Sequence, residues 1–191
     1  TPSELLQRDP IALIGASRES ESMSGTLLRN LVDSFDGLIF PVNPNADQIG
    51  SLPAYPSIGD VPQRIDLALI AVPSRFVLDV VRQCVVADVG AVVVITAGFG
   101  ETGDEGQRRA EELRQLACDA DLPLIGPNCL GLLSTNPASS FNATFSAAKP
   151  QSGNVGVLTQ SGALGFVFPE SNRRWNIGLS KLVSLGNKLC L

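Results

Sequence analysis

The sequence predicts an α/β fold built around a parallel sheet that helices cover on both faces. Apolar runs recur about every 25 to 30 residues, and segments with helical periodicity separate them, as in repeated strand–helix–strand units. The runs ALIAV and AVVVI are apolar at every position, which fits strands buried on both sides better than strands with one wet face. With 191 residues, 44% of them hydrophobic, the chain is long enough to bury a full core.

Five strands are expected in the first part of the chain, at residues 11–14, 38–42, 67–72, 91–96 and 122–125. A helical run over residues 27–32 follows the first strand. Two further helices are expected from apolar stripes with spacings of three and four. These stripes comprise Phe76, Val77, Val80, Val81, Cys84 and Val85, and Ala110, Leu113, Leu116, Ala117 and Ala120.

Residues 132–152 break this rhythm, because they are rich in Ser, Asn, Ala and Pro. A loop of this length is usually functional or a linker. We therefore expect a first domain over residues 1–131, a linker over 132–152 and a second unit over 153–191. That unit offers strands at 155–159 and 179–184 and one helix from Gly162, which Pro169 would shorten or kink. It is too small to close a core of its own, so we expect the truncated start of a second α/β domain.

Composition excludes several classes of function. The formal net charge is -5, and no basic stripe exists to neutralise a nucleic-acid backbone, so no nucleic-acid partner is expected. No run approaches the ~20 apolar residues of a membrane span, which predicts a cytoplasmic protein without membrane contact. The four cysteines show no CxxC spacing, and the chain contains no histidine. No zinc knuckle, redox pair, imidazole metal site or Ser-His or Cys-His catalysis is therefore expected from these residues, and a catalytic histidine would have to lie elsewhere.

The first informative turn is LIGPNCLG, at residues 124–131. Pro127 and the flanking glycines place Asn128 and Cys129 at the carboxyl end of a strand, where open parallel sheets bind ligands. Cys129 has two interpretations at this stage, a small buried hydrophobe or a nucleophile at a ligand site.

The second informative turn is VGVLTQSGALG, at residues 155–165. An apolar run breaks at Gln160, Ser161 and Gly162 and resumes with helix-forming residues from Ala163. Free N–H groups and the positive end of the helix dipole favour an anion there. Together the two turns predict one phosphate-bearing ligand.

The turn after the first strand begins at Gly15, and Gly25 precedes the first helix. It is not GxGxxG, so an ordinary turn and a nucleotide site both remain open. An NAD site requires Asp or Glu at the end of the second strand, whereas this chain has Val42, Asn43 and Pro44 there. NAD is therefore disfavoured.

Seven motifs occur in an order and spacing that resemble the nucleoside-diphosphate-forming acyl-CoA synthetases: IALIGAS, PVNP, DLALIAVP, VVVITAGFGETGDEG, LIGPNCLG, LTQSGALG and VSLGNK. That family includes ADP-forming acetyl-CoA synthetase and, more distantly, the α subunit of succinyl-CoA synthetase. The likeness spans residues 5–188. It implies a Rossmann-like, CoA-binding domain followed by the beginning of a flavodoxin-like ligase domain.

The resemblance also implies site residues. Contacts with CoA fall on Gly15, Ala16, Ser17, Arg18, Glu19, Ser20, Val42, Asn43, Pro44, Val72, Pro73, Ile95, Thr96, Ala97, Gly98, Phe99, Asn128 and Cys129. The phosphate or acyl-phosphate site falls on Gln160, Ser161, Gly162 and Ala163. Many members follow the VNP motif with a lysine, but here Asn45 and Ala46 follow it. Arg18 and Arg75 are the candidates to replace that lysine, with a solvated surface position as the alternative for each.

The activity that the resemblance implies is the interconversion of an acid, CoA and ATP with acyl-CoA, ADP and phosphate through acyl-phosphate and phosphohistidine. The phosphohistidine is expected beyond residue 191, and ATP or ADP with Mg²⁺ in an ATP-grasp domain or β subunit, with an oligomer also compatible. The chain alone is then expected to be inactive. The alternatives are a CoA- or acyl-CoA-sensing module fused to a lysine acetyltransferase and an NAD-linked oxidoreductase domain.

Overall fold

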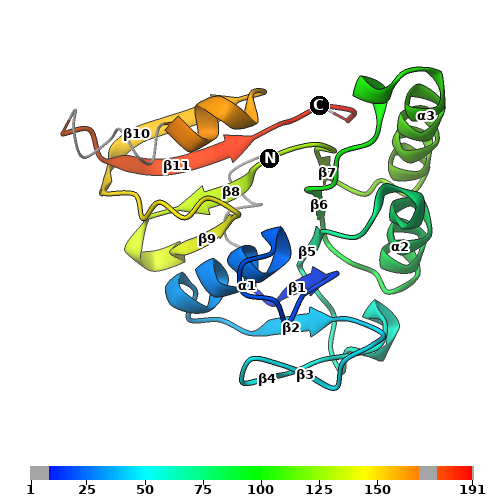
Figure 1. The fold of residues 1–191 in the computed structure, drawn as a ribbon, viewed down its shortest axis with the longest axis horizontal. Helices are drawn as coiled ribbons and strands as arrows, with labels where there is room; N and C mark the ends of the chain where they lie inside the picture. The colour runs from blue at the N-terminus through cyan, green and yellow to red at the C-terminus, as the bar shows by residue number, and fades with distance from the viewer. Residues whose placement is uncertain (1–8, 168–175, 191) are drawn as a thin grey trace.

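The computed structural model describes residues 9–167 and 176–190, and its first part is built on a five-stranded parallel sheet (Figure 1). The strands are β1 (Ile11–Ile14), β2 (Ile39–Val42), β5 (Leu67–Ile70), β6 (Val92–Val94) and β7 (Leu124–Ile125). Their order is β2-β1-β5-β6-β7. All neighbours are parallel, so the predicted parallel sheet is confirmed.

Three helices cover the two faces of this sheet: α1 (Met23–Ser34), α2 (Ser74–Val86) and α3 (Asp104–Asp119). Successive side chains of a strand point to opposite faces. Accordingly, Ile11 and Leu13 of β1 share a core with α1, while Ala12 and Ile14 share another with α2 and α3. The chain therefore leaves β1 toward one face and β5 toward the other. The crevice between these two strand ends is where open α/β sheets bind ligands.

The predicted helical stripes lie on α2 and α3, but not all of their members are buried. In α2, Val77, Val81 and Cys84 are buried, whereas Phe76 is 47% exposed. The helix touches the sheet and α3 through a narrow stripe, so the edges of the predicted stripe face solvent.

A second, mixed sheet follows, with strands β8 (Gly131–Ser134), β9 (Phe141–Thr144), β10 (Ser152–Thr159) and β11 (Leu179–Ser184). Its order is β10-β11-β8-β9, with only the β10–β11 pair parallel. Among the described residues, β10 pairs with β11 alone and forms one edge. Residues 162–167 are helical. Pro169, expected to shorten or kink that helix, lies outside the described residues.

The prediction of a loop over residues 132–152 is wrong. Strands β8 and β9 form an antiparallel hairpin there, joined through the 3-10 turn η4 (Pro137–Ser139). All positions of both strands are buried. Their polar side chains are satisfied internally: Asn142 Oδ1, for example, accepts from the Thr144 N–H at 3.1 Å and from its hydroxyl at 2.7 Å. Buried polar residues of this kind give a strand the composition of a loop.

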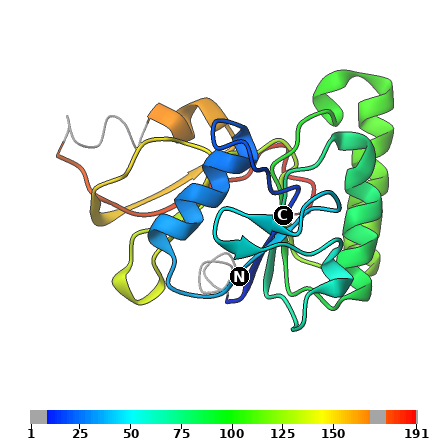
Figure 2. The ribbon, with the colours of Figure 1, turned by 60° about the horizontal axis from the view of Figure 1, so that its bottom comes forward.

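Helix α1 contacts both sheets (Figure 2). Asn30 Nδ2 donates to the carbonyl oxygens of Thr144 at 2.7 Å and Ser146 at 2.8 Å. The hydroxyl of Ser34 accepts from the N–H of Asn142 at 2.7 Å. The two sheets consequently share one core cluster, which contains α1 and side chains from β8, β9 and β11.

None of the helices in the described part of the chain combines the length and the apolar character that a membrane crossing needs. Residues 9–167 and 176–190 hold no group of three or more His, Cys, Asp or Glu side chains placed to bind a metal ion.

Candidate functional site

The first strand-end turn and the VNP motif are held against each other. Gly15 has φ +88°, and a Cβ there would lie 2.6 Å from the Ala71 carbonyl oxygen, so only glycine fits between β1 and β5. The Gly15 N–H donates to the carbonyl of Val42 at 2.9 Å. Asn43 Nδ2 donates to the carbonyl of Ala16 at 2.7 Å. The ends of β1, β2 and β5 thus form one continuous floor.

The start of α1 lies over this floor. Ser22 is the N-cap, and its hydroxyl accepts from the Gly25 N–H at 3.1 Å. A Cβ on Gly25 would lie 2.0 Å from the carbonyl oxygen of Glu19. Gly25 therefore lets the loop that contains Glu19 and Ser20 cross closely over the first turn of the helix.

The ends of β5, β6 and β7 are also tied together. The Thr96 hydroxyl donates to the carbonyl of Val72 at 2.6 Å, and the Asn128 N–H donates to the carbonyl of Thr96 at 2.9 Å. Gly98 has φ +101°, and a Cβ there would lie 2.9 Å from the hydroxyl of Ser74, next to Pro73 at the start of α2. The structure therefore brings all five groups of expected CoA contacts to one edge of the sheet.

Several of these expected contact residues point their side chains away from that edge. The buried ones are Ala16, Val42, Ile95, Thr96, Phe99 and Cys129. Phe99 is fully buried in the core beneath α2 and α3. At these positions, the backbone is the part that a ligand could reach.

Cys129 is 3% exposed, and its thiol donates to the carbonyl of Val94 at 3.3 Å. Burial raises the pKa of this thiol to about 12. Because the thiolate is the nucleophile, the geometry favours the buried-hydrophobe interpretation of Cys129 over the nucleophile.

A cavity of about 300 Å³ opens beside the β1 turn, between α1 and the hairpin of β3 (Gln48–Ile49) and β4 (Leu52–Pro53). Arg18 and Arg29 line it together with Leu28, Ile49 and Leu52. Sequence reasoning missed Arg29 and the hairpin, because strands of two residues show no periodicity.

The two arginines considered as replacements for the missing lysine differ in position. Arg18 Nη2 donates to the carbonyl of Asn45, directly after the VNP motif, at 2.5 Å. The Arg75 guanidinium lies over the ring of Phe76, 4.6 Å from its centroid. Of these two arginines, Arg18 is therefore the one that lies next to the VNP segment, where the lysine is missing.

The turn at Gln160, Ser161 and Gly162 is connected to the LIGPNCLG turn by hydrogen bonds to the end of β11 and the residue after it. Leu185 N–H donates to the carbonyl of Thr159 at 2.8 Å, and the Leu130 N–H donates to Ser184 Oγ at 3.0 Å. A Cβ on Gly165 would lie 2.6 Å from Leu130 Cδ2, so the helical residues 162–167 rest on LIGPNCLG. Gln160, Ser161 and Ala163 are exposed, and a Cβ on Gly162 would meet nothing within 4 Å.

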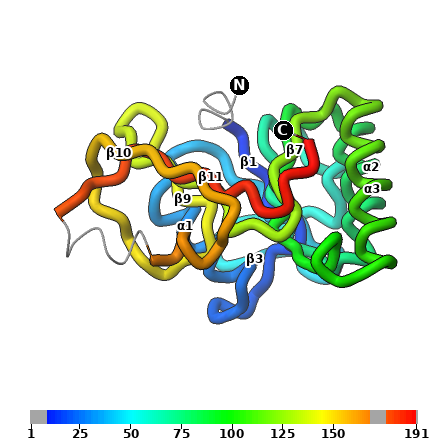
Figure 3. Tube along the Cα trace, turned by 90° about the horizontal axis from the view of Figure 1, so that it is seen from above, coloured from blue at the N-terminus to red at the C-terminus, as the bar shows by residue number. Residues whose placement is uncertain are grey.

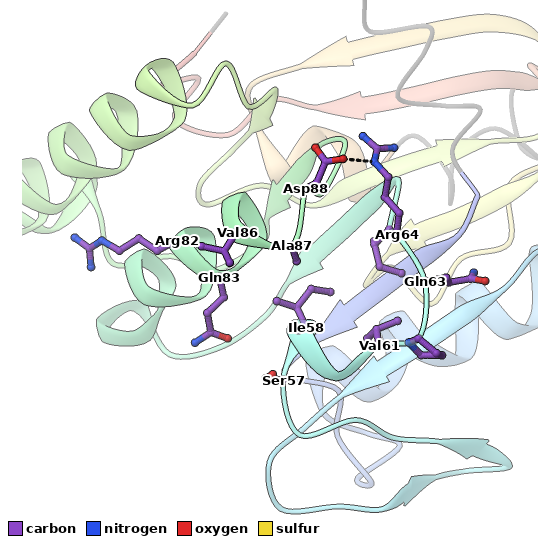
Figure 4. A pocket seen from close by; sticks show the side chains of 13 residues that line it. Ser57, Ile58, Val61, Gln63, Arg64, Arg82, Gln83, Val86, Ala87 and Asp88 are labelled. Carbon is purple, nitrogen blue, oxygen red and sulfur yellow. Dashed lines mark hydrogen bonds and ion pairs between the residues drawn. The ribbon is translucent and has the colours of Figure 1, made fainter.

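A second cavity of about 790 Å³, larger than the one beside α1, lies elsewhere (Figure 4). It is lined by the end of α2, the loop before β5 and the 3-10 turn η2 (Ile58–Asp60). Arg64 Nε contacts Asp88 Oδ2 there at 2.8 Å. Because β5 begins beside this cavity, it opens at the amino end of the sheet, opposite the site above.

The fold is that of an open α/β domain, a class in which ligands bind at the carboxyl ends of the parallel strands. A family model described as "CoA binding domain" matches residues 9–135, and one described as "Succinyl-CoA ligase like flavodoxin domain" matches residues 152–191. The chain belongs to the family of CoA binding domains found in ADP-forming acyl-CoA synthetases and continues into the start of a succinyl-CoA-ligase-like domain. The family resemblance stated from the sequence and the predicted α/β fold class are confirmed.

The chain is 42% identical over 181 residues to the ADP-forming acetate–CoA ligase I of Archaeoglobus fulgidus, covering 95% of this chain and 26% of that protein. It is 40% identical to the α subunit of the ADP-forming acetate–CoA ligase II of Pyrococcus furiosus, covering 93% and 38%. It is also similar to the dinucleotide forming acetyl-coenzyme A synthetase 1 of Ca. Korarchaeum cryptofilum, solved in complex with phosphate and ADP, with TM-score 0.89, 42% identity and coverage of 96% and 39%.

A more distant likeness, at 28% identity over 143 residues, links the chain to the α subunit of an ADP-forming succinate–CoA ligase of Archaeoglobus fulgidus. The chain spans about a quarter to two fifths of the length of the acetate–CoA ligases it matches.

Proposed function

We propose that this chain binds CoA along the carboxyl edge of the parallel sheet, with the residues expected from Gly15 to Cys129 as its contacts. The single observation that supports this most strongly is the joining of the five strand ends into one floor by hydrogen bonds between them. Neighbouring strands lie about 4.8 Å apart, so five strand ends offer an edge of roughly 19 Å to an elongated ligand.

The cavity between α1 and the β3–β4 hairpin suits the nucleotide end of CoA. Arg18 and Arg29 supply guanidinium groups, which bind phosphate through paired donors. Leu28, Ile49 and Leu52 offer apolar surface to a base. A chain of net charge -5 has to hold an anion through such local cations.

For the complete protein we propose an acid–CoA ligase that forms ADP, in which this chain supplies the CoA site. Phosphate at the Gln160 to Ala163 turn, and ATP or ADP with Mg²⁺ in an ATP-grasp domain or β subunit, belong to this proposal. One of the relatives is an α subunit, which supports a partner of that kind.

Thermal melts with CoA, dephospho-CoA and NAD test the binding proposal. A ligand at about 100 times its dissociation constant stabilises the folded state by about 2.7 kcal/mol, so excess CoA raises the melting temperature. Dephospho-CoA gives a smaller shift, and Arg18→Ala removes the difference between the two. Arg82→Ala, in the cavity at the opposite end of the sheet, is the matched control. A shift with NAD and none with CoA would show that the chain is a dinucleotide-binding domain.

The chain by itself is expected to be catalytically silent, because it has no histidine to phosphorylate. Incubation with labelled ATP, CoA and acetate gives neither a phosphoprotein nor acyl-CoA. Turnover by the purified chain would contradict the proposed division of roles.

A further inference from the structure

The Gly98 peptide is held on both sides by charged groups. Glu101, in the 3-10 turn η3 (Gly100–Thr102), accepts through Oε1 from the N–H groups of Gly98 at 2.6 Å and Phe99 at 3.1 Å. Arg109 of α3 donates through Nη1 to the carbonyl oxygen of Gly98 at 2.5 Å. The two polar groups of the peptide bond between Gly98 and Phe99, the Gly98 carbonyl and the Phe99 N–H, therefore both have fixed partners.

The second oxygen of Glu101 reaches the other sheet. Asn187, just after β11, donates through Nδ2 to Glu101 Oε2 at 2.6 Å. Asn187 Oδ1 accepts from Asn128 Nδ2 at 3.3 Å, and its N–H donates to the carbonyl of Pro127 at 2.9 Å. One chain of hydrogen bonds thus joins the turns that follow β6, β11 and β7, and Figure 3 shows the red segment after β11 running next to β7.

The bond between Glu101 and Asn187 is not needed to hold the local turn at Gly98. Holding the N–H groups of Gly98 and Phe99 occupies only Oε1, whereas the bond from Oε2 spans 86 positions of sequence. Partial burial pushes the pKa of Glu101 upward, but hydrogen bonds from Asn187 and from the backbone outweigh it, so the pKa is lowered and the carboxylate is favoured. A charged acceptor strengthens each of these hydrogen bonds.

The geometry points to Glu101 as a positioning residue for CoA, one that fixes the Gly98 and Asn128 turns relative to each other by fastening both to Asn187. This inference rests on the proposed CoA site. It makes CoA affinity depend on a contact between the two sheets, although Asn187 lies outside the expected contact residues.

An exchange of the carboxylate and the amide group between positions 101 and 187 tests the inference in the full 191-residue chain. Glu101→Gln sets an amide NH₂ against that of Asn187, and Asn187→Asp sets one carboxylate against another. The double variant E101Q/N187D lets the amide donate to the carboxylate, which also accepts from Asn128. CoA affinity is measured by calorimetry, with circular dichroism and melting curves on every variant. Glu111→Gln, which removes a carboxylate paired with Arg114 on the exposed side of α3, is the matched control.

Each single variant is expected to bind CoA about tenfold more weakly, a factor equal to about 1.4 kcal/mol, and the double variant to recover wild-type affinity. Should a single variant fail to fold, the folded double variant decides: wild-type affinity supports the inference, and weak binding overturns it. Single variants with lowered melting temperature but unchanged CoA affinity would reduce Glu101 to a structural role and leave the CoA proposal standing. A wild-type chain that binds no CoA would overturn the proposed function and this inference together.

Discussion

At the level of single residues, side chains at the strand ends act mainly on the neighbouring backbone. Asn43, Thr96 and Cys129 each donate to a carbonyl of an adjacent strand end. A ligand at this edge would meet peptide groups that these side chains have fixed. Substitutions there are therefore expected to shift turns rather than to delete one ligand contact.

The cysteines test this picture of buried, inward-facing side chains. Burial raises the pKa of the Cys84 and Cys129 thiols to about 12 in each case, whereas Cys118 is exposed. Because only the thiolate reacts, pulsed iodoacetamide at pH 8 followed by mass spectrometry should label Cys118 first. Cys84 and Cys129 should react only on unfolding. Rapid labelling of Cys129 in the folded chain would show that its thiol is accessible, and Cys118→Ser provides the control for the fast phase.

Among the elements, α1 is the one that joins the two sheets, and Asn30 is its main polar contact. Asn30→Ala leaves the carbonyls of Thr144 and Ser146 without this donor, at an expected cost of about 1 to 3 kcal/mol in the free energy of unfolding. Asp33→Ala, one turn further along, breaks an exposed ion pair with Lys149 and should cost about 0 to 1 kcal/mol. Urea unfolding measures both, and equal losses would contradict the assignment.

The helical residues 162–167 give a second prediction at this scale. A side chain at Gly162 meets open space, and Gly162 has no left-handed φ, so Gly162→Val is expected to fold normally. If phosphate approaches this turn, that variant should lower ligase activity in the complete enzyme and leave CoA affinity intact. Ser161→Ala should cost about 1 kcal/mol of stability, as for a lost helix cap, because the Ser161 hydroxyl accepts from the Leu164 N–H.

Crystals of the complete enzyme would show whether an anion occupies this helix start. Full activity in both variants, with no anion there, would leave Ser161 as a cap only.

Sequence analysis predicted best the strands whose core positions mostly carry apolar side chains, which are all four positions of β1 and Leu179, Leu182 and Val183 of β11. The strands at residues 11–14 and 179–184 have the predicted bounds. The strand expected over 67–72 ends at Ile70, because the apolar pair Ala71 and Val72 already belongs to the turn that packs on Gly15. The β8–β9 hairpin escaped prediction because its buried polar residues are satisfied by contacts that no local pattern contains.

The candidate site likewise contains some residues that the sequence indicated and some contacts that it did not. The glycines at positions 15 and 98 are among the residues that the resemblance implies, and in the structure each permits a close approach that a Cβ would block. The Arg29 side of the cavity and the Glu101 to Asn187 hydrogen bond depend on how distant segments pack. Such contacts follow from the tertiary structure and not from spacing along the chain.

For the whole molecule, the shared core has a thermodynamic consequence. Leu132, Phe141 and Val183 of the second sheet belong to the same buried cluster as Ile11 and Leu67 of the first. Neither sheet can lose this contact without exposing the apolar surface of the other. The chain should therefore unfold in one transition, with coincident curves from circular dichroism and calorimetry. Two separated transitions would show that the sheets are independent units.

The outer edge of β10 adds a property of a different kind. Val155 and Leu158 of this strand are 40% and 65% exposed, and in the described part of the chain the strand pairs on one side only. A strand edge recruits partners through main-chain groups, which every residue except proline carries in full. Pairing at this edge would therefore depend on an incoming segment that is extended and free of proline, more than on the identity of its side chains.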